Sequence, residues 1–541
     1  MISSFLLLLT CVFSAAAAPF FEESSSFNYN PQVVTVYKGI NVTYSGYLNT
    51  TSGLEMFTGV PYAMPPVGAL RFKAPAAFKP QQEVMVNVTL VTPVCKQPDV
   101  NTSVEDCLTV NIARHTGVQS HERLPVLVWF YGGDFVMGSA GNPQYDPAGI
   151  VQTSIDMGNP VIMVVVNYRI HAYGFMMGEA AEKANATNAG LLDQRLALEW
   201  IHEHIHAFGG DPKKVTIFGA SAGGTSIVAQ MILEGMDEKG LFRAAMHMSG
   251  AFAQNFDRQA TIGAADVLYN LTGCTAANTT DQIACLQALS EEDLFKSVVA
   301  TLADYPGDSF GPYNDTKVFP DHPTALIKQG YLAKVPLISG DVIDEAGSYA
   351  PKDVSTNDIA LVTAGEYFTF ATGINGSTIW PYYASPNLTD LSPHYVNATA
   401  LAGFSEYFER FCTMAGDAWF NSAREFLMKV QMERNLPLWV YKFAEEYPVD
   451  SPLGVVHYMD IPFWFSHPAA TPSAVQKTLA TSMTRALVSY AVTMDPSAIS
   501  GVNWESYYSD ASYLQWKADD ISMKPNNAHR EGLDYIISLF P

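Results

Sequence analysis

The clearest candidate for chemistry is Gly219-Ala220-Ser221-Ala222-Gly223, a G-x-S-x-G sequence in the middle of the chain. A β-branched run leads into it, and a helix-like run follows it. In that context the serine occupies a tight turn that exposes its hydroxyl, and small neighbours let strand and helix approach closely. Ser221 is therefore a candidate nucleophile, and the backbone N–H of Ala222 is a candidate donor to a developing oxyanion. A purely structural Gly/Ser turn is the alternative, and the strand–turn–helix context favours catalysis over it.

A second pattern, His202-Glu203-His204-Ile205-His206, satisfies H-E-x-x-H on a segment that the sequence predicts to be helical. On a helix, His202 and His206 share one face, as the two histidine ligands of a zinc metalloprotease do. The alternative is a solvated, histidine-rich face of a structural helix. These two residue patterns therefore predict different enzymes, a serine hydrolase and a zinc enzyme.

The framework that must position these residues is an alternation of apolar, β-rich runs with longer helix-like segments. The run VIMVVVN has no polar alternation, as expected of a strand buried on both faces. The strand candidates are Val126–Tyr131, Val161–Asn167, Val215–Phe218, Val335–Ser339 and Leu438–Phe443. The helix candidates are Ala189–Ala207, Ala222–Leu233, Phe404–Met432 and Thr478–Val492. This alternation predicts an α/β protein with a mostly parallel central sheet, and the region of about 345–435 is a candidate helical cap.

Several stretches together resemble a known family over nearly the whole chain. They are Phe57–Phe72 (FTGVPYAMPPVGALRF), Glu105–Ile112 (EDCLTVNI), Asn167–Arg169 (NYR), Leu192–Trp200 (LDQRLALEW) and Phe208–Pro212 (FGGDP), followed by the Ser221 turn. They are similar to the type-B carboxylesterases and lipases, which include cholinesterases and fungal lipases. The resemblance implies an α/β-hydrolase fold, with helices on both faces of the sheet, and hydrolysis of carboxylic esters. The histidine-rich pattern lies inside this match, so a structural helix is expected there, and no metal or other cofactor is expected.

The same resemblance implies the other catalytic residues. The acid is Glu345, in the sequence GDVIDEAG, and the base is His457, in GVVHYMDIPF. Asp344 is adjacent and chemically possible, but the motif position falls on Glu345. The chain order of serine, acid and histidine is the one expected of this fold. The implied mechanism is a two-step acyl transfer, in which His457 takes the Ser221 proton and water later hydrolyses the acyl-enzyme.

The remaining oxyanion donors are implied to be the N–H groups of Gly133 and Asp134, within Trp129–Gly138 (WFYGGDFVMG). Two residues depart from the family pattern: Asp134 stands where a third glycine is usual, and Ala220 where glutamate is common. Backbone donation survives the first change, because every residue except proline carries an N–H. A carboxylate beside a developing oxyanion is repulsive, however, unless it points away or is protonated. Both departures leave the catalytic triad intact and bear on rate and substrate preference.

The composition of the 541 residues limits the partners and the cellular location. The balance of 30 Lys+Arg against 53 Asp+Glu gives a formal charge of −23, which disfavours binding to nucleic acids and anionic lipids. No apolar run reaches the roughly 18–20 residues needed to span a bilayer. Residues 1–18 predict a secretory signal peptide, since an apolar run ends in small residues at Ala16–Ala18. Residues 19–541 are then expected to form one α/β-hydrolase domain.

Glycosylation sites and cysteines agree with secretion. Asn-x-Ser/Thr occurs at Asn41, Asn49, Asn87, Asn101, Asn185, Asn270, Asn278, Asn314, Asn375, Asn387 and Asn397, which predicts a glycoprotein. In an oxidising compartment, the close spacing of Cys95 with Cys107, and of Cys274 with Cys285, favours two local disulfides. Cys412 is then expected to be a buried free thiol. We expect a secreted, extracellular protein, and the sequence does not predict its oligomeric state.

The first cysteine pair also bears on the substrate. In the family that the chain resembles, the loop closed by this pair often carries a lid or part of the gorge wall. Here it encloses only the residues between Cys95 and Cys107, far fewer than in the lidded lipases. This predicts an open-mouthed esterase for short to medium acyl esters, without strong interfacial activation. The alternatives are a lipase acting on long-chain acylglycerols and a catalytically weak binding or adhesion member; the latter typically lacks the nucleophile.

Overall fold

The structure is a computed structural model, which describes most of the chain after residue 31. The described residues are 32–37, 39–87, 92–98, 100–253, 258–276, 281–304, 310–368, 375–384, 404–447, 453–468, 471–508, 511–526 and 530–541. The expected signal peptide, residues 1–18, lies outside these ranges, as do the sequons at Asn278, Asn387 and Asn397.

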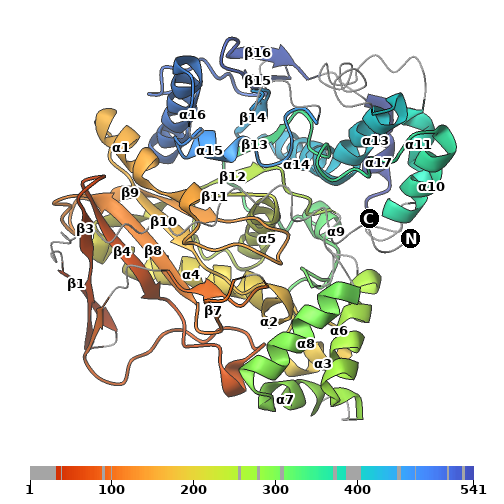
Figure 1. The fold of residues 1–541 in the computed structure, drawn as a ribbon. Helices are drawn as coiled ribbons and strands as arrows, with labels where there is room; N and C mark the ends of the chain where they lie inside the picture. Colours follow the sequence, from red (N-terminus) through yellow and green to blue (C-terminus); the bar gives the residue numbers. More distant parts are fainter. Residues whose placement is uncertain are drawn as a thin grey trace.

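A large twisted sheet of eleven described strands forms the centre of the fold (Figure 1). In spatial order the strands are β16 (Ser522–Pro525), β15 (Ser512–Trp516), β14 (Leu438–Phe443), β13 (Leu337–Val342), β12 (Ala244–Met248), β11 (Gly210–Ala220), β9 (Leu124–Phe130), β10 (Ile162–Val166), β8 (Thr109–His115), β4 (Leu54–Pro61) and β3 (Tyr47–Asn49). Neighbouring strands from β10 to β15 pair in parallel, and the strands beyond them at both edges pair antiparallel. All residues of β10 and β12 are buried, as the unbroken apolar run at β10 predicts.

Helices cover both faces of this sheet. Helix α1 (Ala148–Asp156) packs against α16 (Ala474–Thr493), and α4 (Ala189–His204) packs against α5 (Ala222–Asp237). Both α5 and α16 contact the central strands β9 and β11. The predicted α/β class with a mostly parallel sheet is therefore confirmed. The predicted strand Leu438–Phe443 is observed with the same bounds. The other predicted strands and helices correspond to observed ones in which at least one end is shifted, except that the predicted helix Phe404–Met432 is divided.

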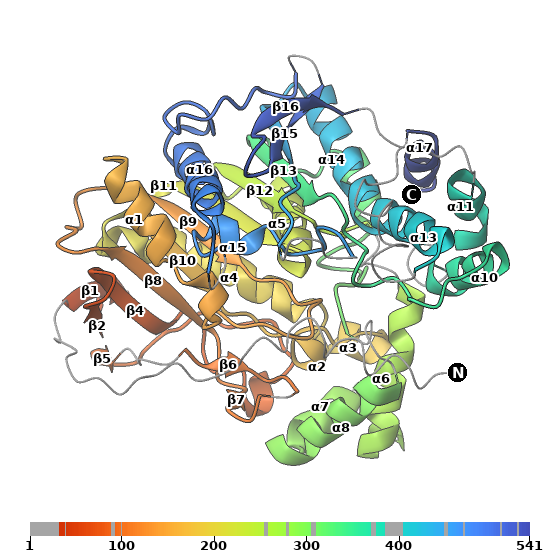
Figure 2. The ribbon, with the colours of Figure 1, turned by 45° about the horizontal axis from the view of Figure 1, so that its top comes forward.

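That divided helix belongs to the helical cap region. It consists of α13 (Glu406–Gly416), a π-helical turn (Asp417–Asn421) and α14 (Ser422–Glu433). Together with α10 (Asn357–Phe368), α11 (Gly376–Tyr383) and the C-terminal α17 (Arg530–Ser538), α13 forms a group at one side of the sheet (Figures 1 and 2). A second group, which the sequence analysis did not anticipate, comprises α6 (Arg258–Thr272), α7 (Asp281–Ala288) and α8 (Glu291–Asp304).

Smaller elements complete the described fold. The strands β1 (Gln32–Tyr37), β2 (Ile40–Ser45) and β5 (Val84–Asn87) form one small sheet, and β6 (Val94–Cys95) and β7 (Ser103–Val104) form another. The short helices are α2 (His171–Gly174), α3 (Glu179–Ala184), α9 (Pro323–Lys328) and α15 (Ile461–Trp464). Among the described helices, none has the length and apolar character needed to cross a bilayer.

The cysteines pair as the sequence predicts. One disulfide joins Cys95 to Cys107, and the other joins Cys274, in a 3₁₀ turn after α6, to Cys285 of α7. Cys95, Cys107 and Cys274 are buried, whereas Cys285 is only partly buried and packs against the edge of the core. Cys412 is buried and forms no disulfide with a described residue, as predicted. The second disulfide therefore ties α7 to the end of α6 within the second helical group.

Candidate active site

Ser221 lies on the predicted tight turn between β11 and α5. Its backbone has φ 58° and ψ −124°, a left-handed conformation that is unfavourable for a residue with a side chain. The flanking glycines are required by close packing. A Cβ atom at Gly219 would lie 2.6 Å from the Gly223 carbonyl oxygen, and one at Gly223 would lie 2.0 Å from the Phe130 carbonyl oxygen. Strand and helix therefore approach as the G-x-S-x-G pattern predicts, and the strained turn belongs to a candidate functional site.

Glu345 and His457 are joined directly by a hydrogen bond. Glu345 follows β13, and its Oε2 lies 2.5 Å from His457 Nδ1. The other carboxylate oxygen, Oε1, accepts hydrogen bonds from the Val342 N–H at 2.9 Å and the Ser249 hydroxyl at 2.5 Å. Both partners of the Glu345–His457 pair are buried. The carboxylate is therefore held on both oxygens and can fix the orientation of the imidazole; sequence analysis missed Ser249, which no local motif marks.

Asp344 bonds to the backbone of the loop that carries His457 and not to the imidazole. Its Oδ2 accepts a hydrogen bond from the Val455 N–H at 2.7 Å, and its own N–H donates to the Val455 carbonyl at 3.1 Å. Gly454 packs against this carboxylate so tightly that an added Cβ would lie 2.2 Å from Oδ2, and its φ is +73°. Asp344 thus fastens the loop that carries His457, whereas Glu345 contacts the imidazole itself.

The second imidazole nitrogen of His457 faces the opposite way. His457 Nε2 is buried and has no hydrogen-bond partner among the described residues, so it makes no bond to Ser221 in this structure. Gly132 lies between the turn that carries Ser221 and the loop that carries His457 and Tyr458. A Cβ atom there would lie 2.9 Å from Ser221 Cβ and 3.0 Å from Tyr458 Cε2. The candidate nucleophile and the histidine loop therefore border the same glycine, and catalytic hydrogen bonds often tighten only when substrate binds.

The candidate oxyanion loop follows β9 and has an unusual backbone. Left-handed φ angles occur in succession at Gly133 (112°), Asp134 (55°) and Phe135 (57°). The Gly133 carbonyl accepts from the Met137 N–H at 2.9 Å, which closes the loop. Within the described residues, the N–H groups of Gly133 and Ala222 donate to no other group. The Asp134 side chain is exposed, and its charge adds to burial in raising the pKa of Tyr349.

Aromatic side chains surround His457 on the side of the cap region. The Phe420 ring, on the π-helical turn, lies 4.6 Å from the imidazole between centroids, and the Tyr349 ring lies at 5.5 Å. Trp419 contacts Tyr349 edge-on at 6.1 Å. A π-helical turn inserts one extra residue per turn and is frequent at functional sites, and here it presents two neighbouring aromatic side chains to the site. Sequence analysis did not find these residues, because the turn is not visible in the apolar periodicity.

The histidine-rich pattern does not form a metal site in the described part of the chain. Helix α4 ends at His204, so His206 lies in a following 3₁₀ turn and loses the i, i+4 relation to His202. His204 is buried against Tyr37, with ring centroids 4.2 Å apart, and burial lowers the pKa of His204 to about 4. No described group of three His, Cys, Asp or Glu side chains has a metal-binding arrangement. In this structure His204 therefore packs against Tyr37 in the protein interior.

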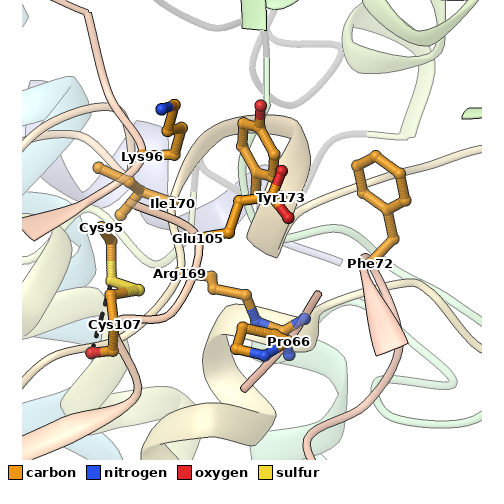
Figure 3. A pocket seen from close by; sticks show the side chains of 9 residues that line it. All are labelled: Pro66, Phe72, Cys95, Lys96, Glu105, Cys107, Arg169, Ile170 and Tyr173. Atoms are coloured by element: carbon orange, nitrogen blue, oxygen red, sulfur yellow. Dashed lines mark hydrogen bonds between the residues drawn. A yellow bond between two sulfur atoms is a disulfide. The ribbon is translucent and has the colours of Figure 1, made fainter. Parts of the chain in front are cut away.

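A small cavity beside the first disulfide is a packing feature. Its lining residues include Cys95, Cys107, Glu105 and Arg169, and none of the candidate catalytic residues (Figure 3). It has space for about one water molecule. The disulfide loop is also pinned at its base, where the side-chain amide of Gln97 exchanges two hydrogen bonds with the backbone of Gly138, at 2.8 and 3.0 Å.

With this geometry in place, comparisons with known proteins identify the family. The model of the carboxylesterase family matches residues 31–531. The chain belongs to the carboxylesterase family. Lipase 4 of Diutina rugosa is 30% identical over 579 residues, covering 98% of each chain. The secreted triacylglycerol lipase LIP1 of Gibberella zeae is 32% identical over 460 residues, covering 76% of each chain.

Solved structures give the same result. A pNB esterase is 30% identical and superimposes with a TM-score of 0.75, covering 93% of this chain and all of that one. A thermophilic pNB esterase is 28% identical, with a TM-score of 0.73 and coverage of 93% and 100%. The carboxylesterase is therefore a carboxylic ester hydrolase of the α/β-hydrolase fold, as the sequence resemblance implies.

The loop that carries His457 contains a buried carboxyl group that should make stability depend on pH. Asp460 Oδ2 accepts hydrogen bonds from the Tyr441 hydroxyl at 2.7 Å and the Trp464 indole N–H at 3.3 Å. Burial, only partly offset by the Tyr441 hydrogen bond, raises the pKa of Asp460 from 3.8 to about 6. The folded protein thus holds this proton more tightly than the unfolded chain does. This tighter binding contributes to the free energy of unfolding. The contribution is largely present below about pH 4 and is lost as the pH rises through 6.

Replacing Asp460 by asparagine should remove this dependence. The free energy of unfolding of Asp460→Asn, relative to wild type, should shift in favour of the variant by about 2 kcal/mol between pH 4 and 7. Urea unfolding at pH 4, 5, 6 and 7 measures the shift. The exposed Asp358→Asn serves as the control for loss of a carboxylate at the surface. A constant offset of Asp460→Asn from wild type would refute the prediction.

Proposed function

We propose that this carboxylesterase acts through an acyl-enzyme on Ser221, with His457 as general base and Glu345 as the acid that orients it. The observation that carries the proposal is the 2.5 Å hydrogen bond between Glu345 and His457, beside the strained turn that presents Ser221. A serine, a histidine and a carboxylate in these relations form the machinery of acyl transfer on several unrelated folds.

The proposed chemistry proceeds in two steps. His457 Nε2 accepts the proton of Ser221 as Oγ attacks the ester carbonyl carbon, and Glu345 stabilises the resulting imidazolium. The N–H groups of Gly133, Asp134 and Ala222 stabilise the oxyanion. His457 then gives its proton to the departing alcohol. In the second step, water loses a proton to His457 and attacks the acyl-enzyme, which releases the carboxylic acid and restores Ser221.

Asp134 is compatible with this scheme because of its exposure. Its backbone N–H is the group that the reaction uses, and its side chain is exposed. Water and salt screen an exposed carboxylate, which weakens its repulsion of a developing oxyanion. The exposure of Asp134 therefore disfavours the alternative of a catalytically weak binding or adhesion member, as does the presence of Ser221, Glu345 and His457 together.

For the substrate, we infer short to medium acyl esters. The support is the short Cys95–Cys107 loop, which is fastened by the two residues that follow Cys95. Gln97 bonds the backbone of Gly138 beside the oxyanion loop, and Lys96 contacts Glu291 of α8 at 2.5 Å. A loop fastened in this way has little length left to act as a mobile lid. A lipase acting on long-chain acylglycerols is the second candidate, since similar proteins are named as lipases and one as a triacylglycerol lipase.

A rate series on p-nitrophenyl esters from acetate to palmitate distinguishes the two candidates. We expect kcat/KM to be highest for short to medium chains, because the short loop leaves no lid to enclose a long apolar chain. Hydrolysis of tributyrin should also rise smoothly through its solubility limit. Highest activity on palmitate, or a sharp rise once tributyrin forms droplets, would establish the lipase instead. Ser221→Ala provides the blank for both assays.

We also propose that the mature chain, residues 19–541, is a single secreted, extracellular glycoprotein domain. Some similar proteins are named as secreted lipases. The sequon residues Asn41, Asn101, Asn185, Asn270 and Asn375 are exposed, as glycan attachment requires. A mass above that of the polypeptide, reduced by an amidase that removes N-linked glycans, would support the glycoprotein assignment; an unmodified mass from a eukaryotic secretory host would refute it.

A further inference from the structure

Tyr458, the residue after His457, makes an unusual pair of contacts. Its hydroxyl accepts a hydrogen bond from the Gly132 N–H at 3.2 Å, although 326 positions separate the two residues in the chain. The same hydroxyl lies 2.6 Å from the Tyr145 hydroxyl. Tyr145 is buried and packs against Trp129, with ring centroids 5.3 Å apart. The Tyr458 hydroxyl is thus held between the core and the strand end that begins the oxyanion loop.

The backbone at Tyr458 supports a specific role for this side chain. Its φ is 77°, a left-handed conformation that is rare for a bulky residue. Such strain persists only where the surrounding contacts impose it, and it concentrates at functional sites. Burial raises the pKa of Tyr458 to about 12, so the hydroxyl stays neutral at physiological pH.

Gly132 is the point at which these contacts affect the chemistry. It immediately precedes Gly133, the first candidate oxyanion donor. It also lies against Ser221, since an added Cβ would be 2.9 Å from Ser221 Cβ and 2.6 Å from the Ala220 carbonyl oxygen. A small shift of Gly132 would therefore move the oxyanion donor relative to the nucleophile. Within the described residues, the Tyr458 hydroxyl is the acceptor that fixes the Gly132 N–H.

We propose that Tyr458 is a positioning residue that couples the histidine loop to the oxyanion loop through the Gly132 N–H. This inference rests on the proposed function, because it needs Ser221 as the nucleophile and Gly133 as an oxyanion donor. Tyr145 supports the coupling by holding the Tyr458 hydroxyl in place. The loop that presents the base and the loop that stabilises the oxyanion then move as one unit.

The test is Tyr458→Phe, which removes the acceptor and keeps the ring. We expect kcat for p-nitrophenyl butyrate to fall about 10- to 100-fold, since a misplacement of about 1 Å at a reacting centre has effects of this size. KM should change less than about twofold. The affinity for an alkyl trifluoromethyl ketone, which forms a tetrahedral adduct with the serine, should fall by about the same factor as kcat. Tyr145→Phe should have a smaller effect of the same kind, because the Gly132 N–H keeps its acceptor.

A matched control is Tyr490→Phe, which removes another buried hydroxyl, one that donates to the Ala245 carbonyl at 3.0 Å. It should lower thermal stability and leave kcat and ketone affinity unchanged. Titration of active sites with a phosphonate corrects each variant for its folded fraction. Unchanged kcat and ketone affinity in Tyr458→Phe would overturn the proposal. If Tyr458→Phe does not fold, kcat and ketone affinity are measured in Tyr145→Phe, and no change in either would overturn the proposal.

Failure of this inference is distinguishable from failure of the proposed function. Full activity in Ser221→Ala would refute the proposed function. An inactive Ser221→Ala together with a fully active Tyr458→Phe would refute only the positioning role.

Discussion

Replacing Ser221 by alanine should lower kcat for p-nitrophenyl butyrate by about 10⁶-fold, as removal of the nucleophile does in other serine hydrolases. Without the hydroxyl no acyl-enzyme can form, and the oxyanion donors alone give only slow hydrolysis by water. The change should leave the fold intact, because alanine removes one oxygen atom and keeps the Cβ at this turn. Hydrolysis of p-nitrophenyl butyrate, followed by release of p-nitrophenolate, measures the loss.

The matched control is Ser226→Ala, five residues later in α5. Ser226 is buried, whereas Ser221 is half-buried, and Ser226 donates to the Ala222 carbonyl at 2.8 Å. This variant should keep kcat within a few-fold of wild type and lose some thermal stability. If Ser221→Ala kept more than about a thousandth of wild-type kcat, Ser221 would not be the nucleophile.

Replacing Glu345 by glutamine should lower kcat by about 10⁴-fold, with little change in KM. The amide oxygen of glutamine can still accept from the Val342 N–H and the Ser249 hydroxyl, which hold Oε1 in the wild type. The amide NH₂ would then face His457 Nδ1 and donate to it. Nε2 would carry the imidazole proton, and His457 could not accept the proton of Ser221. The variant should therefore be slow because its imidazole proton is on the wrong nitrogen. Measurement of kcat and KM on p-nitrophenyl butyrate tests this.

Asp344→Asn is the natural comparison, because the two carboxylates are adjacent. The asparagine oxygen can still accept from the Val455 N–H, so the histidine loop should keep its position and kcat should stay within about tenfold of wild type. A larger loss of kcat in Asp344→Asn than in Glu345→Gln would contradict the account, because it would make Asp344 the acid that orients His457.

Local sequence patterns predicted the framework and the candidate nucleophile Ser221. The apolar run at β10 and the strand–turn–helix context of Ser221 are short-range features, and the observed elements match them. The resemblance to the family placed Glu345 and His457, and the structure brings these two residues into contact across 112 positions. A motif can transfer such a pairing only because the fold is shared.

The contacts that sequence analysis missed depend on long-range packing. Ser249 reaches Glu345 across 96 positions, and Gly132 reaches Tyr458 across 326, with no periodicity that links them. Phe420 faces His457 because of a π-helical turn that apolar spacing does not reveal. The histidine-rich pattern offered a zinc site only on the assumption that helix α4 continues to His206. The helix ends at His204, and His206 lies in the 3₁₀ turn that follows.

The most direct measurement of the role of Ser221 is the mass of the protein after reaction with a p-nitrophenyl alkylphosphonate, followed by peptide mapping. One phosphonyl group should attach to each chain, at Ser221, with release of one equivalent of p-nitrophenol. Labelling should be absent in Ser221→Ala and much slower in Glu345→Gln, because His457 would no longer activate the serine. Labelling of another residue, or full esterase activity in protein whose Ser221 is phosphonylated, would contradict the acyl-enzyme mechanism proposed for this carboxylesterase.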